Sequence, residues 1–106
     1  MSRLVNFGKA VEALKAGHRV SREGWSGKGL FVFMQVPSMI DKGVVPKMQS
    51  LPLSVKDEFQ ERFDSGGEQY IRYSNQLAIV FPDNQIHGWA PSGSDVLSED
   101  WIILNS

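Results

Sequence analysis

The chain has 106 residues, of which 42% are hydrophobic and 22% charged, and this balance is typical of one globular domain rather than a disordered or fibrous protein. Eleven basic and twelve acidic residues give a formal net charge of −1, which lacks the positive excess of proteins that bind along a nucleic-acid backbone. The absence of cysteine excludes disulfides, a thiolate nucleophile and cysteine-based zinc sites.

The same features set expectations about partners and location. No apolar stretch approaches the length of a membrane span, and the N-terminus lacks the apolar core of a secretory signal. We therefore expect a cytoplasmic protein with neither a membrane nor a nucleic-acid polymer as partner, and with no metal or cofactor. A monomer of this size leaves about a third of its unfolded surface exposed, so self-association is one route to a deep ligand site.

A helix is predicted near the start of the chain. Asn6 is a suitable cap, and apolar residues then recur at the spacing of one helix face, at Phe7, Ala10, Val11 and Leu14. Gly17 is expected to end this helix in the left-handed conformation. Residues 18–22 are then expected to be extended, so a helix and a strand open the domain.

The middle of the chain alternates irregular and regular segments. Residues 24–29 are too rich in glycine for regular structure and lead into an apolar strand over 30–36. A second helix is predicted after an irregular excursion, capped within 54–57 and ended by Gly66 and Gly67. Its apolar positions are Val55, Phe59 and Phe63.

The last part of the chain is predicted to be mainly strands. Runs at 70–73, 77–81 and 86–89 are separated by turn residues and indicate a meander. A helical turn is expected over 95–99, before a closing strand over 101–104 that carries Trp101 in the core. The elements together predict an α+β fold of one domain, residues 1–106, with the N-terminal helix packed on a mostly antiparallel sheet and an inserted second helix.

The densest group of chemically useful side chains lies at residues 22–29. Arg22 and Lys28 supply two cations, Trp25 supplies an aromatic face, and glycines let backbone N–H groups approach an anion. This composition suits a phosphate, with Trp25 stacked on a base, although it matches neither the Walker loop nor the dinucleotide fingerprint. The alternative, a tight turn with Trp25 buried as a core residue, stays open.

A second group lies at residues 87–95, where Trp89 stands beside small hydroxyls and a carboxylate. Ser92 and Asp95 would hold ribose hydroxyls while Trp89 faces a purine. The competing interpretation is that the serines and Asp95 cap the last helical turn, above all Ser94. No spacing connects His18 or His87 to a serine and a carboxylate, so no catalytic residue is assigned.

Two blocks of the sequence together resemble a phage-associated family of small proteins, the second type of Thoeris anti-defence protein. They cover about half of the residues. The first block holds Asn6-Phe7-Gly8, Ala10, Ala13-Leu14-Lys15-Ala16-Gly17 and Val20-Ser21-Arg22-Glu23-Gly24-Trp25-Ser26-Gly27-Lys28-Gly29. The second holds Trp89-Ala90-Pro91-Ser92, Asp95-Val96-Leu97 and Glu99-Asp100-Trp101.

The resemblance implies a non-catalytic sponge that sequesters cyclic nucleotide immune signals, notably glycocyclic ADP-ribose and in some members cyclic di- or trinucleotides. Such a protein blocks bacterial anti-phage defence, such as Thoeris or CBASS, in the host cytoplasm. The resemblance also implies a homotetramer whose pockets form where subunits meet. The matched positions expected to line a pocket are Phe7, Arg22, Trp25, Lys28, Trp89, Ser92 and Asp95.

Residues 39–67 look like an insertion relative to short members of that family. The segment would reshape the pocket, add a second one, or form a solvent-facing arm. Tyr70 and Tyr73 either join a site or only pair across strands.

Two other classes of function stay open. A hydrolase acting on such a nucleotide would use His87 or His18 as a base with Asp95 as its partner. A phage or prophage adaptor would bind a protein and no small ligand.

Overall fold

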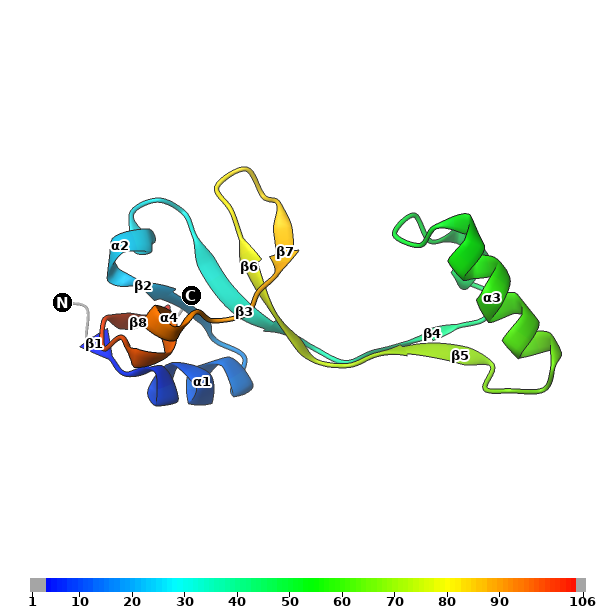
Figure 1. Cartoon of the computed structure of the whole chain (residues 1–106), viewed down its shortest axis with the longest axis horizontal. Coiled ribbons are helices and arrows are strands. Elements are labelled where there is room, and N and C mark those ends of the chain that lie inside the picture. Colours follow the sequence, from blue (N-terminus) through cyan, green and yellow to red (C-terminus); the bar gives the residue numbers. More distant parts are fainter. Residues whose placement is uncertain (1–3, 105–106) are drawn as a thin grey trace. The chain divides into compact units, whose positions relative to one another are not determined.

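The structure, a computed structural model, describes residues 4–104. The chain divides into two compact units (Figure 1). The terminal unit joins residues 1–35 to residues 75–106, and the central unit comprises residues 36–74.

The terminal unit is an antiparallel sheet with helices at its connections. Within the described residues the sheet has six strands in the order β1-β8-β2-β3-β6-β7, and every neighbouring pair is antiparallel. Its elements are β1 (Leu4–Val5), α1 (Phe7–Lys15), β2 (Arg19–Arg22), α2 (Glu23–Ser26), β3 (Phe31–Gln35), β6 (Gln76–Val80), β7 (Ile86–Gly88), α4 (Gly93–Leu97) and β8 (Trp101–Leu104). This arrangement confirms the predicted α+β class.

The central unit pairs β4 (Ser38–Asp41) with β5 (Tyr70–Tyr73) around a short 3-10 turn, η1 (Val45–Lys47), and a helix, α3 (Leu53–Asp64). Its core contains Val45, Phe63 and Ile71, which are at most 7% exposed. The segment 39–67, predicted to be an insertion, lies inside this unit. That shorter relatives lack it stays a prediction.

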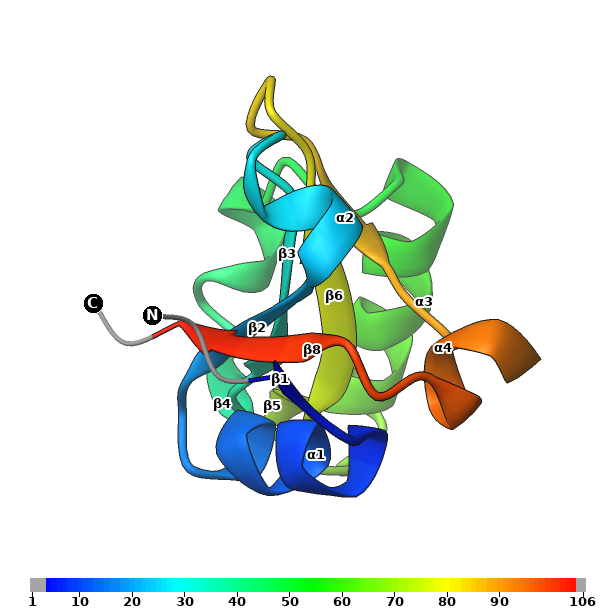
Figure 2. The same cartoon turned by 90° about the vertical axis from the view of Figure 1, so that its left-hand side faces the viewer.

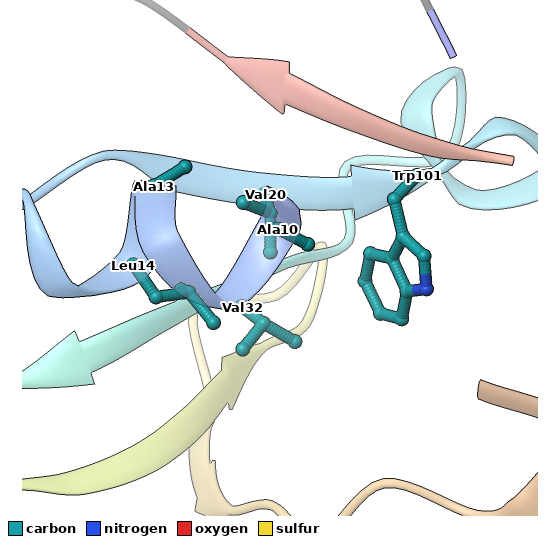
Figure 3. Packing of buried hydrophobic residues seen from close by; sticks show 6 residues of the cluster. All are labelled: Ala10, Ala13, Leu14, Val20, Val32 and Trp101. Atoms are coloured by element: carbon teal, nitrogen blue, oxygen red, sulfur yellow. The ribbon is translucent and has the colours of Figure 1, made fainter. Parts of the chain in front are cut away.

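Helix α1 forms as predicted. The Asn6 side chain accepts a hydrogen bond from the Lys9 amide at 2.9 Å, and Gly17 follows the helix with a φ of 95°. The buried face of α1 lies against β2, β3 and β8 (Figure 2). Figure 3 shows this core, which consists of Ala10, Ala13, Leu14, Val20, Val32 and Trp101.

Trp101 is the largest side chain of that core and is fully buried. Its strand, β8, lies between β1 and β2 in the sheet. Helix α1 packs against β8 and covers the indole from one side. The prediction that Trp101 is a core residue is confirmed. Burying a side chain of this size is one of the largest apolar contributions that a single residue makes.

The prediction that residues 24–29 are irregular is wrong in part. Residues 23–26 form the short helix α2, and only the residues after it are a turn. The Glu23 amide donates to the Asp100 carbonyl at 2.9 Å, and the Trp25 ring packs on Trp101. Tertiary contacts therefore outweigh the low helix propensity of Gly24.

The predicted meander is wrong in one connection. β5 pairs with β4, whereas β6 pairs with β3 and β7. Because Gln35 and Gln76 are partners in the main sheet, the chain leaves at the end of β3 and returns at the start of β6. The intervening residues form their own pair of strands, so β5 does not neighbour β6.

The first residues of other elements differ by a few positions from those predicted from the sequence. α3 begins at Leu53 rather than within 54–57, because the Pro52 carbonyl accepts the first helical hydrogen bonds from the amides of Val55 and Lys56. α4 begins at Gly93 rather than at Asp95. The first described residues, Leu4 and Val5, form the short strand β1, where the sequence predicted a direct run into a helix.

Candidate functional site

Three indole rings meet in the terminal unit. Trp25 on α2, Trp89 after β7 and Trp101 on β8 have ring centroids 5.5 to 6.5 Å apart, and all three pairs are edge-to-face. We call this group the indole cluster. Trp101 is fully buried beneath it, whereas Trp25 and Trp89 are half-buried. The core interpretation of Trp25 holds in part, because its ring packs on Trp101 and still retains exposed surface. That this ring stacks on a base stays a prediction.

Phe7 extends the cluster on its α1 side. Its ring lies 5.5 Å from that of Trp101, and its side chain is half-buried. The structure thus brings three of the predicted site residues, Phe7, Trp25 and Trp89, onto one buried indole. Edge-to-face pairs at these distances stabilise by about 0.5–1.5 kcal/mol each beyond the area that they bury, so these contacts favour one arrangement of the rings.

Arg22 lies at the end of β2 and is held by groups from the end of the chain. Its Nε donates to Asp100 at 3.0 Å, its Nη1 donates to Asp95 at 3.0 Å, and its Nη2 donates to both Ser98 and Asp100. The side chains of Arg22, Asp95 and Asp100 are only 21%, 12% and 34% exposed. The hydrogen bonds that Arg22 donates to Asp100 and Asp95 raise its pKa, although burial opposes them. Most of the donors of this guanidinium are therefore occupied by the protein itself.

Ser92 and Asp95 form a capping box at the start of α4. The Asp95 amide donates to Ser92 Oγ at 3.1 Å, and the Ser92 amide donates to Asp95 Oδ2 at 2.8 Å. The Asp95 carbonyl also accepts from the buried Trp101 indole nitrogen at 2.8 Å. The capping interpretation is right for Ser92 and Asp95 and wrong for Ser94. Ser94 lies within the first turn, and its carbonyl accepts from Ser98 Oγ.

Asp95 is a buried residue, with 8% of its surface exposed. Burial by itself would raise its pKa, but hydrogen bonds from Ser92 and from Arg22 outweigh this effect and lower the pKa below the ordinary 3.8. Asp95 is therefore a carboxylate held by internal partners.

Lys28 lies in the turn after α2. Its amide donates to the Trp25 carbonyl at 2.8 Å, and its side chain is exposed. The next residue, Gly29, has a φ of 79°, a backbone conformation that glycine adopts without strain. Within residues 4–104, the ammonium group of Lys28 makes no ion pair.

The histidines do not join a carboxylate in the described part of the chain. His87 is exposed, its ring lies 5.1 Å from that of Phe81, and its Nε2 lies 3.1 Å from Gln85. No hydrogen bond links His87 or His18 to Asp95 among residues 4–104. Within the same residues, no group of three or more histidine, aspartate or glutamate side chains is arranged to hold a metal ion.

Sequence reasoning misses Ser98 and Asp100 as partners of Arg22. In the sequence, Asp100 stands out only as part of the block Glu99-Asp100-Trp101. Nothing local indicates that it faces a residue 78 positions earlier. The one signal in the sequence is general: an arginine that is buried on folding is paired with counter-charges, because an unpaired buried charge is strongly unfavourable.

The central unit holds a separate cavity of about 610 Å³ between α3 and β5. The guanidinium of Arg62 lies over Phe59, and that of Arg72 lies over Tyr70. Each arginine also forms an exposed ion pair, Arg62 with Glu58 and Arg72 with Glu68. Tyr70 thus lines a cavity, whereas Tyr73 pairs with Ser38 and packs on the core of the unit.

Among the described residues, no helix has the length and apolar character needed to cross a bilayer.

The fold and site define a small α+β protein in which the segments next to an antiparallel sheet carry half-buried indoles beside a largely buried network of charges. The Thoeris anti-defense 2-like (Tad2-like) domain model matches residues 5–104. The Thoeris anti-defense 2 protein of Bacillus phage SP01 is 35% identical over 108 residues, which cover 99% of this chain and 100% of that protein. The chain therefore belongs to the Thoeris anti-defense 2-like family, as its sequence motifs predict. This membership supports an anti-defence role against Thoeris, and the family name gives no sign of catalysis.

The capping box predicts a measurable difference between two neighbouring serines. Ser92→Ala removes the side chain that accepts from the Asp95 amide, and we expect the free energy of unfolding to fall by about 1 kcal/mol. Ser94→Ala is the matched control in the same helix, with an expected change within about 0.5 kcal/mol. Urea denaturation followed by tryptophan fluorescence measures both, and equal losses would contradict the assignment of the cap.

Proposed function

We propose that this protein counteracts Thoeris defence by binding a cyclic nucleotide signal of the glycocyclic ADP-ribose type and withholding it from its receptor, without changing it chemically. The observation that carries the proposal is the geometry of Trp25 and Trp89. Both are half-buried, their centroids lie 6.5 Å apart, and both rest on the buried Trp101. Family membership supplies the biological setting.

Indole rings suit this task because every base has a flat face that can stack on an aromatic ring. Stacking on an aromatic side chain contributes about 1–3 kcal/mol per base. The rings of the indole cluster are already ordered by their contacts with Trp101, so little side-chain entropy remains to be lost when a ligand binds. The exposed ammonium group of Lys28, in the turn beside Trp25, is available to a phosphate.

A sponge has to compete with a receptor, which requires a Kd of about 1 nM or below, equivalent to roughly −12 kcal/mol. One stacked purine and one ion contact do not reach this value against an association cost of about 4–15 kcal/mol. We therefore propose that the site is completed where copies of the chain meet, in a homotetramer. Val96 and Leu97 on α4 are 44% and 83% exposed, so an interface would remove apolar surface from water there.

The signal is made in the cytoplasm of an infected bacterium, and we propose that the protein acts there. Cyclic di- and trinucleotides, including signals of CBASS systems, share the purine and phosphate groups that this site would recognise. They are the further ligands to test.

Isothermal titration of the full-length protein with glycocyclic ADP-ribose tests the proposal. We expect saturable heat with a Kd of about 1 nM or lower. Light scattering should give a mass of four chains of 11.9 kDa each. The absence of heat with glycocyclic ADP-ribose and with cyclic di- and trinucleotides would refute sequestration.

The fate of the ligand separates sequestration from hydrolysis. After the complex is denatured by heat, mass spectrometry should recover the nucleotide with its mass unchanged. A mass shifted by one water would identify a hydrolase instead. Capture of a protein partner from infected cells, with no bound small molecule, would identify an adaptor.

A further inference from the structure

We infer that the two cations of the candidate site have different tasks. Arg22 is a positioning residue that sets the geometry of Trp25 and Trp89 without contacting the ligand, and Lys28 supplies the positive charge that meets a phosphate. The inference rests on the proposed function for its ligand, but the positioning role of Arg22 is measurable without any ligand.

One guanidinium ties together the three segments that carry the indoles. Arg22 is the residue before α2, which holds Trp25. Its partner Asp95 lies on α4, which follows the segment of Trp89, and its partner Asp100 directly precedes Trp101. Arg22 and Trp101 are also paired in register between β2 and β8.

Each partner of Arg22 is fixed by further bonds, so the network is closed. Asp95 is held by the Ser92 amide through its carboxylate and by the Trp101 indole nitrogen through its carbonyl. The Asp100 carbonyl accepts from the Glu23 amide at the first residue of α2. Displacing the guanidinium would therefore move the supports of Trp25 and Trp101, and with Trp101 the ring on which Trp89 packs.

Four of the five N–H groups of Arg22 already donate to Asp95, Ser98 and Asp100, so a ligand phosphate could take a paired contact from Arg22 only by replacing one of these partners. The buried Asp95 would then lose its counter-charge, which is strongly unfavourable in an environment that excludes water. Lys28 carries no such penalty, because its side chain is exposed and makes no ion pair within residues 4–104. The two cations are thus distinguished by their partners, although the sequence places them in the same loop.

The test compares Arg22→Lys with Lys28→Gln in the full-length protein. Arg72→Lys is the matched control, since Arg72 belongs to an exposed pair with Glu68 in the central unit. Near-ultraviolet circular dichroism reports on the indoles, and all three tryptophans of the chain lie in the terminal unit. Titrations at low and high salt report on charge contacts with the ligand, because salt weakens exposed ion contacts.

We expect Arg22→Lys to alter the tryptophan bands in the absence of ligand. It should also weaken binding by at least about tenfold while the salt dependence of binding stays that of the wild type. Lys28→Gln should leave the bands unchanged, weaken binding and reduce the salt dependence. Arg72→Lys should change none of these.

Unchanged tryptophan bands in Arg22→Lys would overturn the positioning role. A reduced salt dependence in Arg22→Lys, with wild-type binding in Lys28→Gln, would reverse the two assignments. If Arg22→Lys does not fold, Asp100→Asn perturbs the same network at its most exposed carboxylate and is measured in the same way. If no cyclic nucleotide binds the wild type, the proposed function and the role of Lys28 fail together, while the dichroism still decides the role of Arg22.

Discussion

Trp25→Ala is expected to weaken binding of the cyclic nucleotide by at least about tenfold, because it removes one stacking surface worth about 1–3 kcal/mol. The mass of the assembly should stay that of the wild type. Trp25→Phe keeps a flat ring on Trp101 and should recover part of the affinity. Titration calorimetry and light scattering on the same preparations measure both quantities.

Two controls separate loss of a contact from loss of the fold. Trp25 also packs on Trp101, so thermal unfolding of each variant sets a temperature at which all are folded. Phe81→Ala removes an aromatic side chain that contacts His87 and no ring of the indole cluster, so affinity should not change. Wild-type affinity in Trp25→Ala, or an equal loss in Phe81→Ala, would show that the ligand does not stack on the indole cluster.

Asp95→Ala is expected to lower the free energy of unfolding of the terminal unit by about 3 kcal/mol. The substitution takes a counter-charge from Arg22, whose side chain is 21% exposed, and removes the carboxylate from the capping box of α4. Small domains are stable by about 5–15 kcal/mol, so the variant should still fold. Urea denaturation followed by tryptophan fluorescence reports on the terminal unit alone, since the tryptophans lie there.

Glu12→Ala is the control for this prediction. Glu12 pairs with Lys9 at 3.8 Å on the surface of α1, with side chains 74% and 66% exposed. Exposed pairs contribute about 0–1 kcal/mol, so the loss should be small. A similar loss in both variants would mean that the buried network is not a major source of stability.

The pH dependence of stability tests the same carboxylate. The pKa of Asp95 is lower in the folded protein than its ordinary value of 3.8. The carboxylate therefore contributes its full stabilisation at pH values well above 3.8. The contribution is lost as the pH falls through the lowered pKa. The stability advantage of the wild type over Asp95→Asn should therefore be constant near neutral pH and shrink only below about pH 3.8. An advantage that persists unchanged in stronger acid would contradict the lowered pKa.

The features predicted correctly from sequence depend on residues close together in the chain. Helix α1 follows from the Asn6 cap, the apolar spacing and Gly17, which act within a few residues of one another. The buried position of Trp101 follows from an apolar strand at the end of the chain. Family membership likewise follows from the order of two local blocks, and the wider comparison confirms it.

The amino-acid sequence by itself therefore determines helix α1, the main strands of the terminal unit and the family to which the chain belongs, because hydrophobic periodicity, caps and motifs are local. The short helix α2 is not among them, since it depends on tertiary contacts. Only the tertiary structure decides that β5 pairs with β4 and that Arg22 faces Asp95 and Asp100, which lie 73 and 78 positions away. Strand partners and counter-charges are selected by packing and by the cost of burying an unpaired group, and both depend on the whole chain.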